Sequence, residues 1–446
     1  MTAKNVLPWY PVCGPMRPAQ ATGLGEEVSP VRPAAPITQE ELPLAAVQRA
    51  LRKTTEVLAR ELAGPSAEAP NWSETEWRVA RAVVAMHGVS GLLAQSLPWQ
   101  GPPEWGRFLG EQYAQIARRH MRIQELLQLL DSRARDRGIA LLALKGAALH
   151  ARALYAPGER PMADIDLLVR EHDILRASQL LTELGFCAGA ETRKHRTFDP
   201  PGNVKVTTAL GESSAAAIKI ELHSRIREFL PLRPVDISSL VFPSAPHPGI
   251  NEYASDTGLF LHLLLHAAGA MVLREVRLLQ LNDIAHLARR MGPLEWEALF
   301  EQAASTADEH PWWALPPLVL TDRYYGCVPA AILARLAAGC QWSLRTAYRR
   351  RRLSDVSHSY LWISAFPGIE WSRSLREMAT YAAERVRPRP ETFALRATFA
   401  ESQPLVSGGQ WSSFSQRRRM MRWLLARQPR QSSLQPVRAA LNDPPS

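Results

Sequence analysis

The chain has 446 residues, of which 46% are hydrophobic and 22% are charged. This length predicts two packed domains with tails, and the apolar fraction is sufficient for a sizeable buried core, which argues against a largely disordered chain. The formal net charge of +10 favours anionic partners such as nucleotides, nucleic acid or an acidic surface, although solvated arginines on an ordinary basic protein would give the same charge.

Cysteine usage and hydropathy argue against two further classes of protein. Four scattered cysteines form no CxxC pair, so neither a disulfide framework nor a zinc site is predicted: Cys13, Cys187, Cys327 and Cys340. The N-terminus has no apolar segment of signal-peptide length. The longest apolar stretch, Leu259–Leu273, contains two histidines and a glycine and is too short to span a bilayer. We therefore expect a soluble, cytoplasmic protein without a membrane span.

The first half of the chain divides into three segments. Residues 1–38 are rich in Pro, Gly and Ala without periodicity and predict a disordered tail. Residues 39–137 repeat apolar residues at three- and four-residue steps, which predicts a helical region that stops at Gly138. Residues 138–250 predict a small α/β domain. Its strands are expected at 139–144, 163–169, 203–210 and 217–226, and its helices at 147–155 and 172–186.

The second half is predicted to be helical and then basic. Residues 251–345 form a C-terminal helical region with amphipathic segments at 259–270, 273–290 and 296–306. Residues 346–446 are expected to be a basic, partly disordered tail. Together these segments predict an α+β protein, in which a small mixed-sheet domain is embedded between helical segments with disordered tails.

The basic tail carries arginine clusters near aromatic residues. Arg349–Arg352 lie close to Trp342 and Tyr348, and Arg417–Arg419 lie close to Trp423. Such interleaving suits RNA, through phosphate attraction and base stacking, and it also suits an acidic partner or a membrane surface. Solvated charge in a tail is the simpler interpretation.

The sharpest local pattern is Asp164-Ile165-Asp166 in the predicted strand 163–169. Alternate side chains of a strand share a face, so Asp164 and Asp166 project together while Ile165 and Leu167 point the other way. Two adjacent carboxylates repel each other unless a cation lies between them. Magnesium is typically held by one or two carboxylates together with substrate phosphates. The pair therefore predicts a magnesium site, although a DxD triplet on its own is a weak motif.

The turn before this strand predicts a phosphate site. Backbone amides at Gly146, Ala147 and Ala148 would lie at a helix N-terminus, and Lys145 adds a positive charge. A plain strand-to-helix turn would also use a glycine here.

Glu221 is the candidate third carboxylate. It alternates with Ile220 and Leu222 and so points out of an apolar strand, with Lys219 and His223 on its face. The alternative is an exposed strand glutamate paired with Lys219.

The run from Leu141 to Val169, LLALKGAALHARALYAPGERPMADIDLLV, resembles the signature of a bacterial family, the uncharacterised nucleotidyltransferases. That family belongs to the DNA polymerase beta-like nucleotidyltransferase superfamily, so the resemblance implies that fold. Glu221-Leu222-His223 matches a later strand of the family, and the likeness covers about residues 76–336.

The resemblance implies transfer of a nucleoside monophosphate from an NTP to an unknown acceptor, with release of pyrophosphate and two bound Mg²⁺ ions. By position it assigns Asp164, Asp166 and Glu221 to the metal ions, with Glu221 also a candidate base. The acceptor is left open: a small molecule, a peptide, a saccharide or RNA. There are two alternatives to this function. One is a catalytically degenerate binding or regulatory module, and the other is an RNA-directed, toxin-like transferase.

The resemblance also implies the nucleotide contacts, which would be made at Lys145, Gly146 and Ala147. Arg160 would contact phosphate or orient the acidic strand. Ala147 stands where the wider superfamily commonly has serine, which removes one hydroxyl ligand. On the flanking helix, Asp283 is expected to be a structural hydrogen-bonding residue.

His262 and His266 lie four residues apart but lack the glutamate of a zinc-peptidase motif. We expect these two histidines to pack rather than to bind a metal.

Overall fold

The computed structural model describes residues 43–192, 194–202, 210–306, 310–388 and 415–442. The predicted tail 1–38 and nearly all of the predicted strand 203–210 lie outside these residues. The helices are α1 Leu44–Ala63, α2 Glu74–His87, α3 Ser90–Ser96, α4 Pro103–Asp136, α5 Gly146–Ala151, α6 Ile174–Glu183, α7 Ser238–Val241, α8 Asp256–Leu273, α9 Leu278–Ala288, α10 Pro293–Ala304, α11 Leu315–Tyr325, α12 Ala330–Ala338, α13 Trp342–Arg350, α14 Leu353–Val356, α15 Leu375–Val386, α17 Gln416–Leu425 and α18 Gln431–Asn442.

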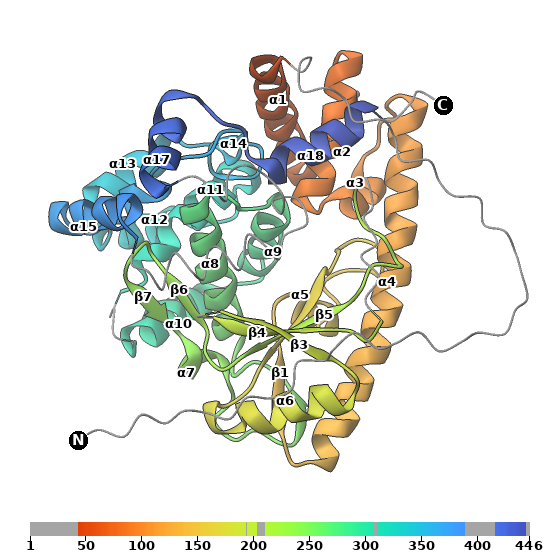
Figure 1. The fold of residues 1–446 in the computed structure, drawn as a ribbon, viewed down its shortest axis with the longest axis vertical. Helices are drawn as coiled ribbons and strands as arrows, with labels where there is room; N and C mark the ends of the chain where they lie inside the picture. Colours follow the sequence, from red (N-terminus) through yellow and green to blue (C-terminus); the bar gives the residue numbers. More distant parts are fainter. Residues whose placement is uncertain (1–42, 193, 203–209, 307–309, 389–414, 443–446) are drawn as a thin grey trace, which may run out of the picture.

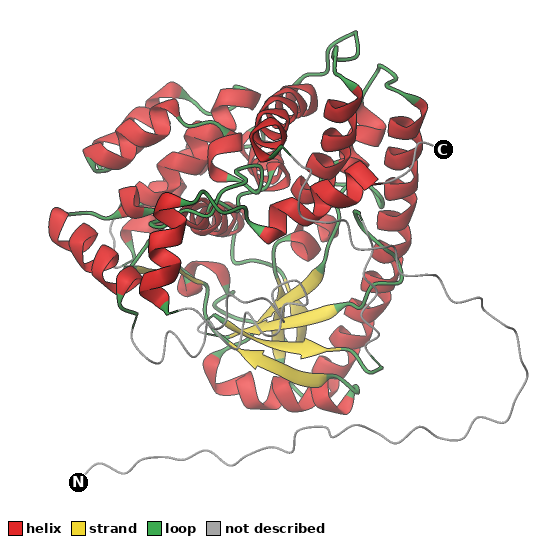
Figure 2. Ribbon diagram, turned by 45° about the horizontal axis from the view of Figure 1, so that its top comes forward, coloured by secondary structure: helices red, strands yellow, loops and turns green. Residues whose placement is uncertain are grey.

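Six strands form one mixed sheet in the order β3-β4-β5-β2-β1-β8, which lies among the helices in Figure 2. The strands are β1 Ala140–Ala143, β2 Asp164–Leu168, β3 Cys187–Glu191, β4 His195–Asp199, β5 Lys219–His223 and β8 Gly249–Asn251, and β6 Arg227–Phe229 pairs with β7 Pro234–Asp236 in a separate hairpin. In the sheet, β2 runs antiparallel to β1 and parallel to β5. This mixed sheet within a helical protein confirms the predicted α+β class. Strands β3, β4 and β8 were not predicted.

The two faces of the central strands have different environments. Ile165 and Leu167 of β2, with Ile220 and Leu222 of β5, pack in a core with apolar residues of α4 and α6. Figure 1 shows α6 below the sheet and α4 running along its side. Because side chains alternate along a strand, β2 and β5 turn their polar residues to the opposite face.

The long helix α4 ends where the sequence predicts. Gly138 takes a positive φ of 62°, which glycine adopts without steric strain, and the Ile139 amide donates to the Ala134 carbonyl at 2.9 Å. The chain then turns directly into β1, so the predicted stop at Gly138 is confirmed.

Helix α8 was predicted to be amphipathic, and this prediction is wrong. Its residues are buried on nearly all sides, because α7, α9, α10 and α11 surround it. Among the described residues it is the one helix that is long and apolar enough to cross a membrane, but 78% of that window is buried inside the protein, as in a core helix. It ends at Leu273 and is followed by Arg274, whose φ is 58°, so the helix predicted from 273 begins only at Leu278.

The first and last described helices close over α2. Arg78 and Arg81 of α2 donate to the carbonyl oxygens of Leu441 and Ala440 in α18, each at 3.1 Å. Figure 1 shows α18, in blue, beside α1 and α2. Helices α14, α15, α17 and α18 lie within the predicted basic tail, and α13 crosses its proposed start at residue 346. The domain boundaries themselves stay predictions.

Candidate functional site

Three acidic side chains project from the polar face of the sheet. Asp164 and Asp166 lie on β2, opposite in direction to the buried Ile165. Asp166 is the direct strand partner of Glu221 on β5. The parallel pairing of two strands that are distant in sequence therefore brings the predicted third carboxylate beside the predicted pair.

Asp166 is buried and lies between a lysine and a histidine. Its Oδ1 lies 2.9 Å from Lys145 Nζ and 3.0 Å from His223 Nε2. Burial alone would raise the pKa of Asp166, but the Lys145 charge and the His223 hydrogen bond hold it well below its usual range. Burial acts to lower the pKa of Lys145, and the negative charges of Asp166 and Asp164 raise it in net. The two residues form a buried ion pair at neutral pH.

Asp164 has a different environment. Within the described part of the chain, its carboxylate makes no hydrogen bond and no ion pair. Burial, followed by the negative charges of Asp166 and Glu221, raises its pKa to about 7. The positive charge of Lys145 does not fully offset the negative charges around Asp164. A bound cation would reduce the repulsion between the carboxylates.

The turn before β2 is held in an unusual backbone conformation. Lys145 has φ 47° and ψ −113°, in the left-handed half of the map that non-glycine residues rarely adopt. Its amide donates to the Tyr253 hydroxyl at 3.1 Å, and this hydroxyl lies 2.8 Å from His262 Nδ1. His262 therefore has a structural hydrogen bond behind the turn. The Ala147 amide donates to the Leu144 carbonyl at 3.2 Å, so a phosphate contact through that amide is not supported.

Gly146 lies directly against Arg160. A Cβ atom at Gly146 would be 2.3 Å from Arg160 Nη1 and 2.9 Å from Met162 Cγ. Arg160 is itself fixed by a buried bidentate pair with Asp283, with Nε–Oδ1 at 2.9 Å and Nη2–Oδ2 at 2.7 Å. The Tyr155 hydroxyl donates to the same carboxylate at 2.8 Å. The geometry shows Arg160 packed against the turn, which is neither the phosphate contact nor the orientation of the acidic strand implied above, and those two roles stay predictions. Asp283 makes the structural hydrogen bonds expected of it.

A second arginine fixes the spacing of the two acidic strands. Arg119 of α4 is buried and donates to the Met162 and Ala216 carbonyls, each at 2.7 Å. The first of these residues precedes β2 and the second precedes β5. One guanidinium therefore ties together the starts of the strands that carry Asp164 and Glu221. No sequence pattern predicted this contact.

A cavity of about 390 Å³ lies over the three carboxylates. One wall is the sheet with Lys145 and Gly146, and the other comes from α8 and the start of α9. Arg277 and Gln280 of this second wall face the cavity from the start of α9. Arg277 is exposed and has no ion-pair partner among the residues that the structure describes. Its charge is therefore available to an anion in the cavity.

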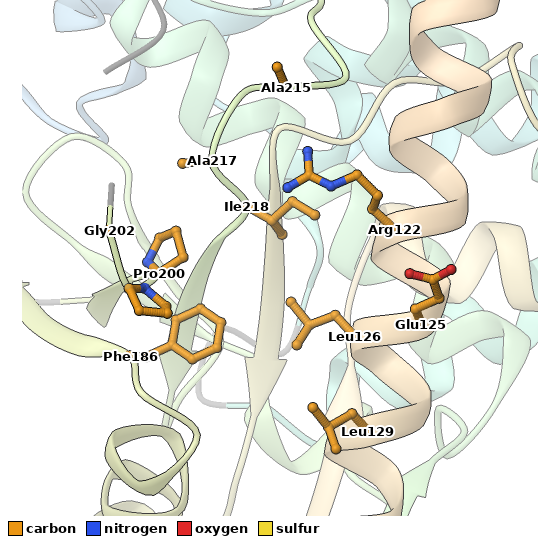
Figure 3. Close-up of a pocket in the computed structure, with 11 residues that line it drawn as sticks. Arg122, Glu125, Leu126, Leu129, Phe186, Pro200, Gly202, Ala215, Ala217 and Ile218 are labelled. Carbon is orange, nitrogen blue, oxygen red and sulfur yellow. The ribbon is translucent and has the colours of Figure 1, made fainter. Parts of the chain in front are cut away.

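A second hollow, of about 470 Å³, lies beside α4 and away from the carboxylates. Figure 3 shows Leu126 and Leu129 of α4 facing Phe186 and Pro200 across it. None of the predicted site residues lines this hollow, so we do not associate it with the site.

The sequence analysis missed His195 on β4. His195 is the direct strand partner of His223, and its Nδ1 lies 3.3 Å from Glu221 Oε2. Burial lowers the pKa of His195. Lys219 pairs instead with Asp199 at 2.9 Å, so the exposed Lys219–Glu221 pair considered above is not formed. No local motif marks His195, since its neighbours in the sequence are ordinary polar residues.

One comparison with known proteins identifies a family. A family model described as "Uncharacterised nucleotidyltransferase" matches residues 73–316, which is more than half of the chain and includes β1, β2 and β5. Searches of curated proteins and of solved structures found no match. On the strength of the family match, the chain belongs to the uncharacterised nucleotidyltransferase family.

Proposed function

We propose that the protein is a magnesium-dependent nucleotidyltransferase that transfers a nucleoside monophosphate from an NTP to an acceptor and releases pyrophosphate. One observation carries this proposal. Asp164, Asp166 and Glu221 lie on one face of adjacent strands, beneath a cavity of about 390 Å³. A cavity of this size is within the usual range for small-molecule sites.

The donor set fits Mg²⁺. Hard divalent cations prefer oxygen ligands, and the carboxylate of Asp164 is free of partners in the described structure. Asp166 would exchange one of its two partners, Lys145 or His223, for the ion. Bound Mg²⁺ supplies neutralisation of the triphosphate and charge stabilisation at the α-phosphorus.

The other residues of the cavity suit a triphosphate. Lys145, once released from Asp166, can reach phosphate oxygens at the turn, and Gly146 lines the same cavity. Arg277 lies on the opposite wall, where it can hold the departing pyrophosphate. These two cations would therefore act on the leaving group, and Arg277 extends the contacts expected from the sequence.

In the reaction, the acceptor oxygen attacks the α-phosphorus of the NTP. The bond from the α-phosphorus to the bridging oxygen of the β-phosphate breaks, and pyrophosphate leaves. Glu221 takes the proton from the acceptor hydroxyl, since its carboxylate reaches the cavity beside Asp166.

The test uses purified full-length protein, Mg²⁺, NTPs labelled at the α-phosphate and a fractionated host lysate. We expect an acceptor to gain label, with release of pyrophosphate, in the wild type and not in Asp164→Asn. Asp136→Asn is the matched control, because Asp136 is exposed at the end of α4. The competing hypothesis of a degenerate module predicts no labelling by any variant and partner binding that is unaffected by Asp164→Asn.

A further inference from the structure

His195, Glu221 and His223 form a compact donor cluster, of which Glu221 lines the cavity. Their ligand atoms all lie within 4.8 Å of one another. The strand register sets this arrangement, because His195 is the direct partner of His223 and the two ring centroids are 5.0 Å apart. Glu221 lies two residues before His223 on the same face of β5.

The separations suit ligands that share one ion. Two ligands bound about 2.1 Å from a tetrahedral ion lie roughly 3.4 Å apart. Glu221 Oε2 is 3.3 Å from His195 Nδ1 and 3.7 Å from His223 Nε2. Asp166 Oδ1 is 3.0 Å from the same His223 nitrogen, which places a candidate fourth ligand beside the cluster. Small side-chain rotations would bring these donors around a single ion.

One nitrogen of the cluster has no hydrogen bond in the described structure. His195 Nδ1 is buried and makes no hydrogen bond of acceptable geometry in the described structure, despite its short distance to Glu221. A buried polar atom without a partner is unfavourable, because it has lost its hydrogen bonds to water. Coordination of a metal ion by this nitrogen would satisfy it.

The donor types select the ion. Mg²⁺ prefers oxygen ligands, whereas imidazole nitrogen suits zinc and the later transition metals. Two histidines with one glutamate are also a known ligand set of zinc sites that keep an open position. We propose that His195, Glu221 and His223 bind a zinc-class divalent cation. This site shares Glu221 with the proposed Mg²⁺ site, but it does not need the reaction, because the ion would also bind in a protein that has lost nucleotidyl transfer.

The test measures metal binding directly, on tag-free full-length protein without nucleotide. Zn²⁺ is titrated by calorimetry, and Co²⁺ is titrated as a spectroscopic probe of nitrogen ligation. We expect one ion per chain and a loss of affinity of about tenfold or more in His195→Gln, since even outer-shell changes cost 10–100-fold. His172→Gln is the matched control, because the His172 side chain is 71% exposed. It should bind as the wild type does.

Two further measurements keep the outcomes separate. Circular dichroism of His195→Gln checks that the variant is folded, and His223→Gln provides a second ligand removal on the neighbouring strand. Asp164→Asn should retain Zn²⁺ affinity while it loses nucleotidyl transfer, so the two proposals fail independently. Wild-type protein that binds no stoichiometric Zn²⁺, or unchanged affinity in folded His195→Gln and His223→Gln, would overturn the inference.

Discussion

Replacement of Gly146 by alanine tests the packing beneath the strand-to-helix turn. The added Cβ would lie 2.3 Å from Arg160 Nη1 and 2.9 Å from Met162 Cγ, and both distances are too short for real contacts. Arg160 cannot withdraw freely, because its guanidinium is buried and pairs with Asp283 through two hydrogen bonds. The turn must therefore shift, or the ion pair must open.

The two responses differ in how much unfolding free energy they cost. Overpacking with the ion pair retained costs about 1–3 kcal/mol of unfolding free energy. Opening of a buried ion pair costs about 3–5 kcal/mol, because it leaves an uncompensated charge. We expect Gly146→Ala to lose stability within these ranges, measured by urea-induced unfolding with circular dichroism as the readout.

Gly110→Ala is the matched control. Gly110 lies inside α4, and a Cβ atom there would meet nothing within 4 Å. Alanine is favoured over glycine in a helix, so this variant should gain about 0.5–1 kcal/mol. If Gly146→Ala were as stable as the wild type, or gained stability as Gly110→Ala does, the steric argument would be refuted.

Three further predictions concern stability. Asp283→Asn should lower the unfolding free energy by about 3–5 kcal/mol, because Arg160 is left buried without its counter-charge. Loss of an exposed ion pair would lower it by less than about 1 kcal/mol. Urea-induced unfolding of Asp283→Asn checks this. Ser73→Ala should lose about 0.5–2 kcal/mol in the same assay, since Ser73 and Glu76 form a capping box at the start of α2. Burial, and then the Arg277 charge, lower the pKa of His87 to about 3. Below about pH 6.5 the unfolded chain therefore binds a proton that the folded protein does not, so stability is full above that pH and falls by about 2 kcal/mol at pH 5. Unfolding free energies of the wild type and His87→Gln between pH 7.5 and 5 should differ in slope, and equal slopes would contradict this assignment.

Local patterns predicted the elements that carry the site. Alternation along residues 163–169 placed Asp164 and Asp166 on one face, and the structure confirms that Ile165 and Leu167 point into the opposite core. The same argument placed Glu221 on the polar face of its strand. These predictions succeeded because side-chain direction in a strand depends only on the backbone of that strand.

The partners of these residues could not be predicted in the same way. Strand β4, with the sequence HRTFD, has one fully buried side chain, Phe198, and so shows no clear alternation. The pairing of His195 with His223 depends on which strands are neighbours, and local sequence does not encode this. Arg160 and Asp283 are 123 residues apart, and their bond depends on how α9 packs against the turn.

The closure of α18 over α2 has a consequence for synthesis of the chain. Arg81 leaves the ribosome 359 residues before its partner Ala440. At about 5–20 residues per second, α2 waits roughly 20–70 s for this cover. Its apolar surface is open to chaperones during that interval. A fragment limited to the family region, residues 73–316, lacks α1 as well as α18 and leaves this face of α2 uncovered permanently, so we expect it to aggregate.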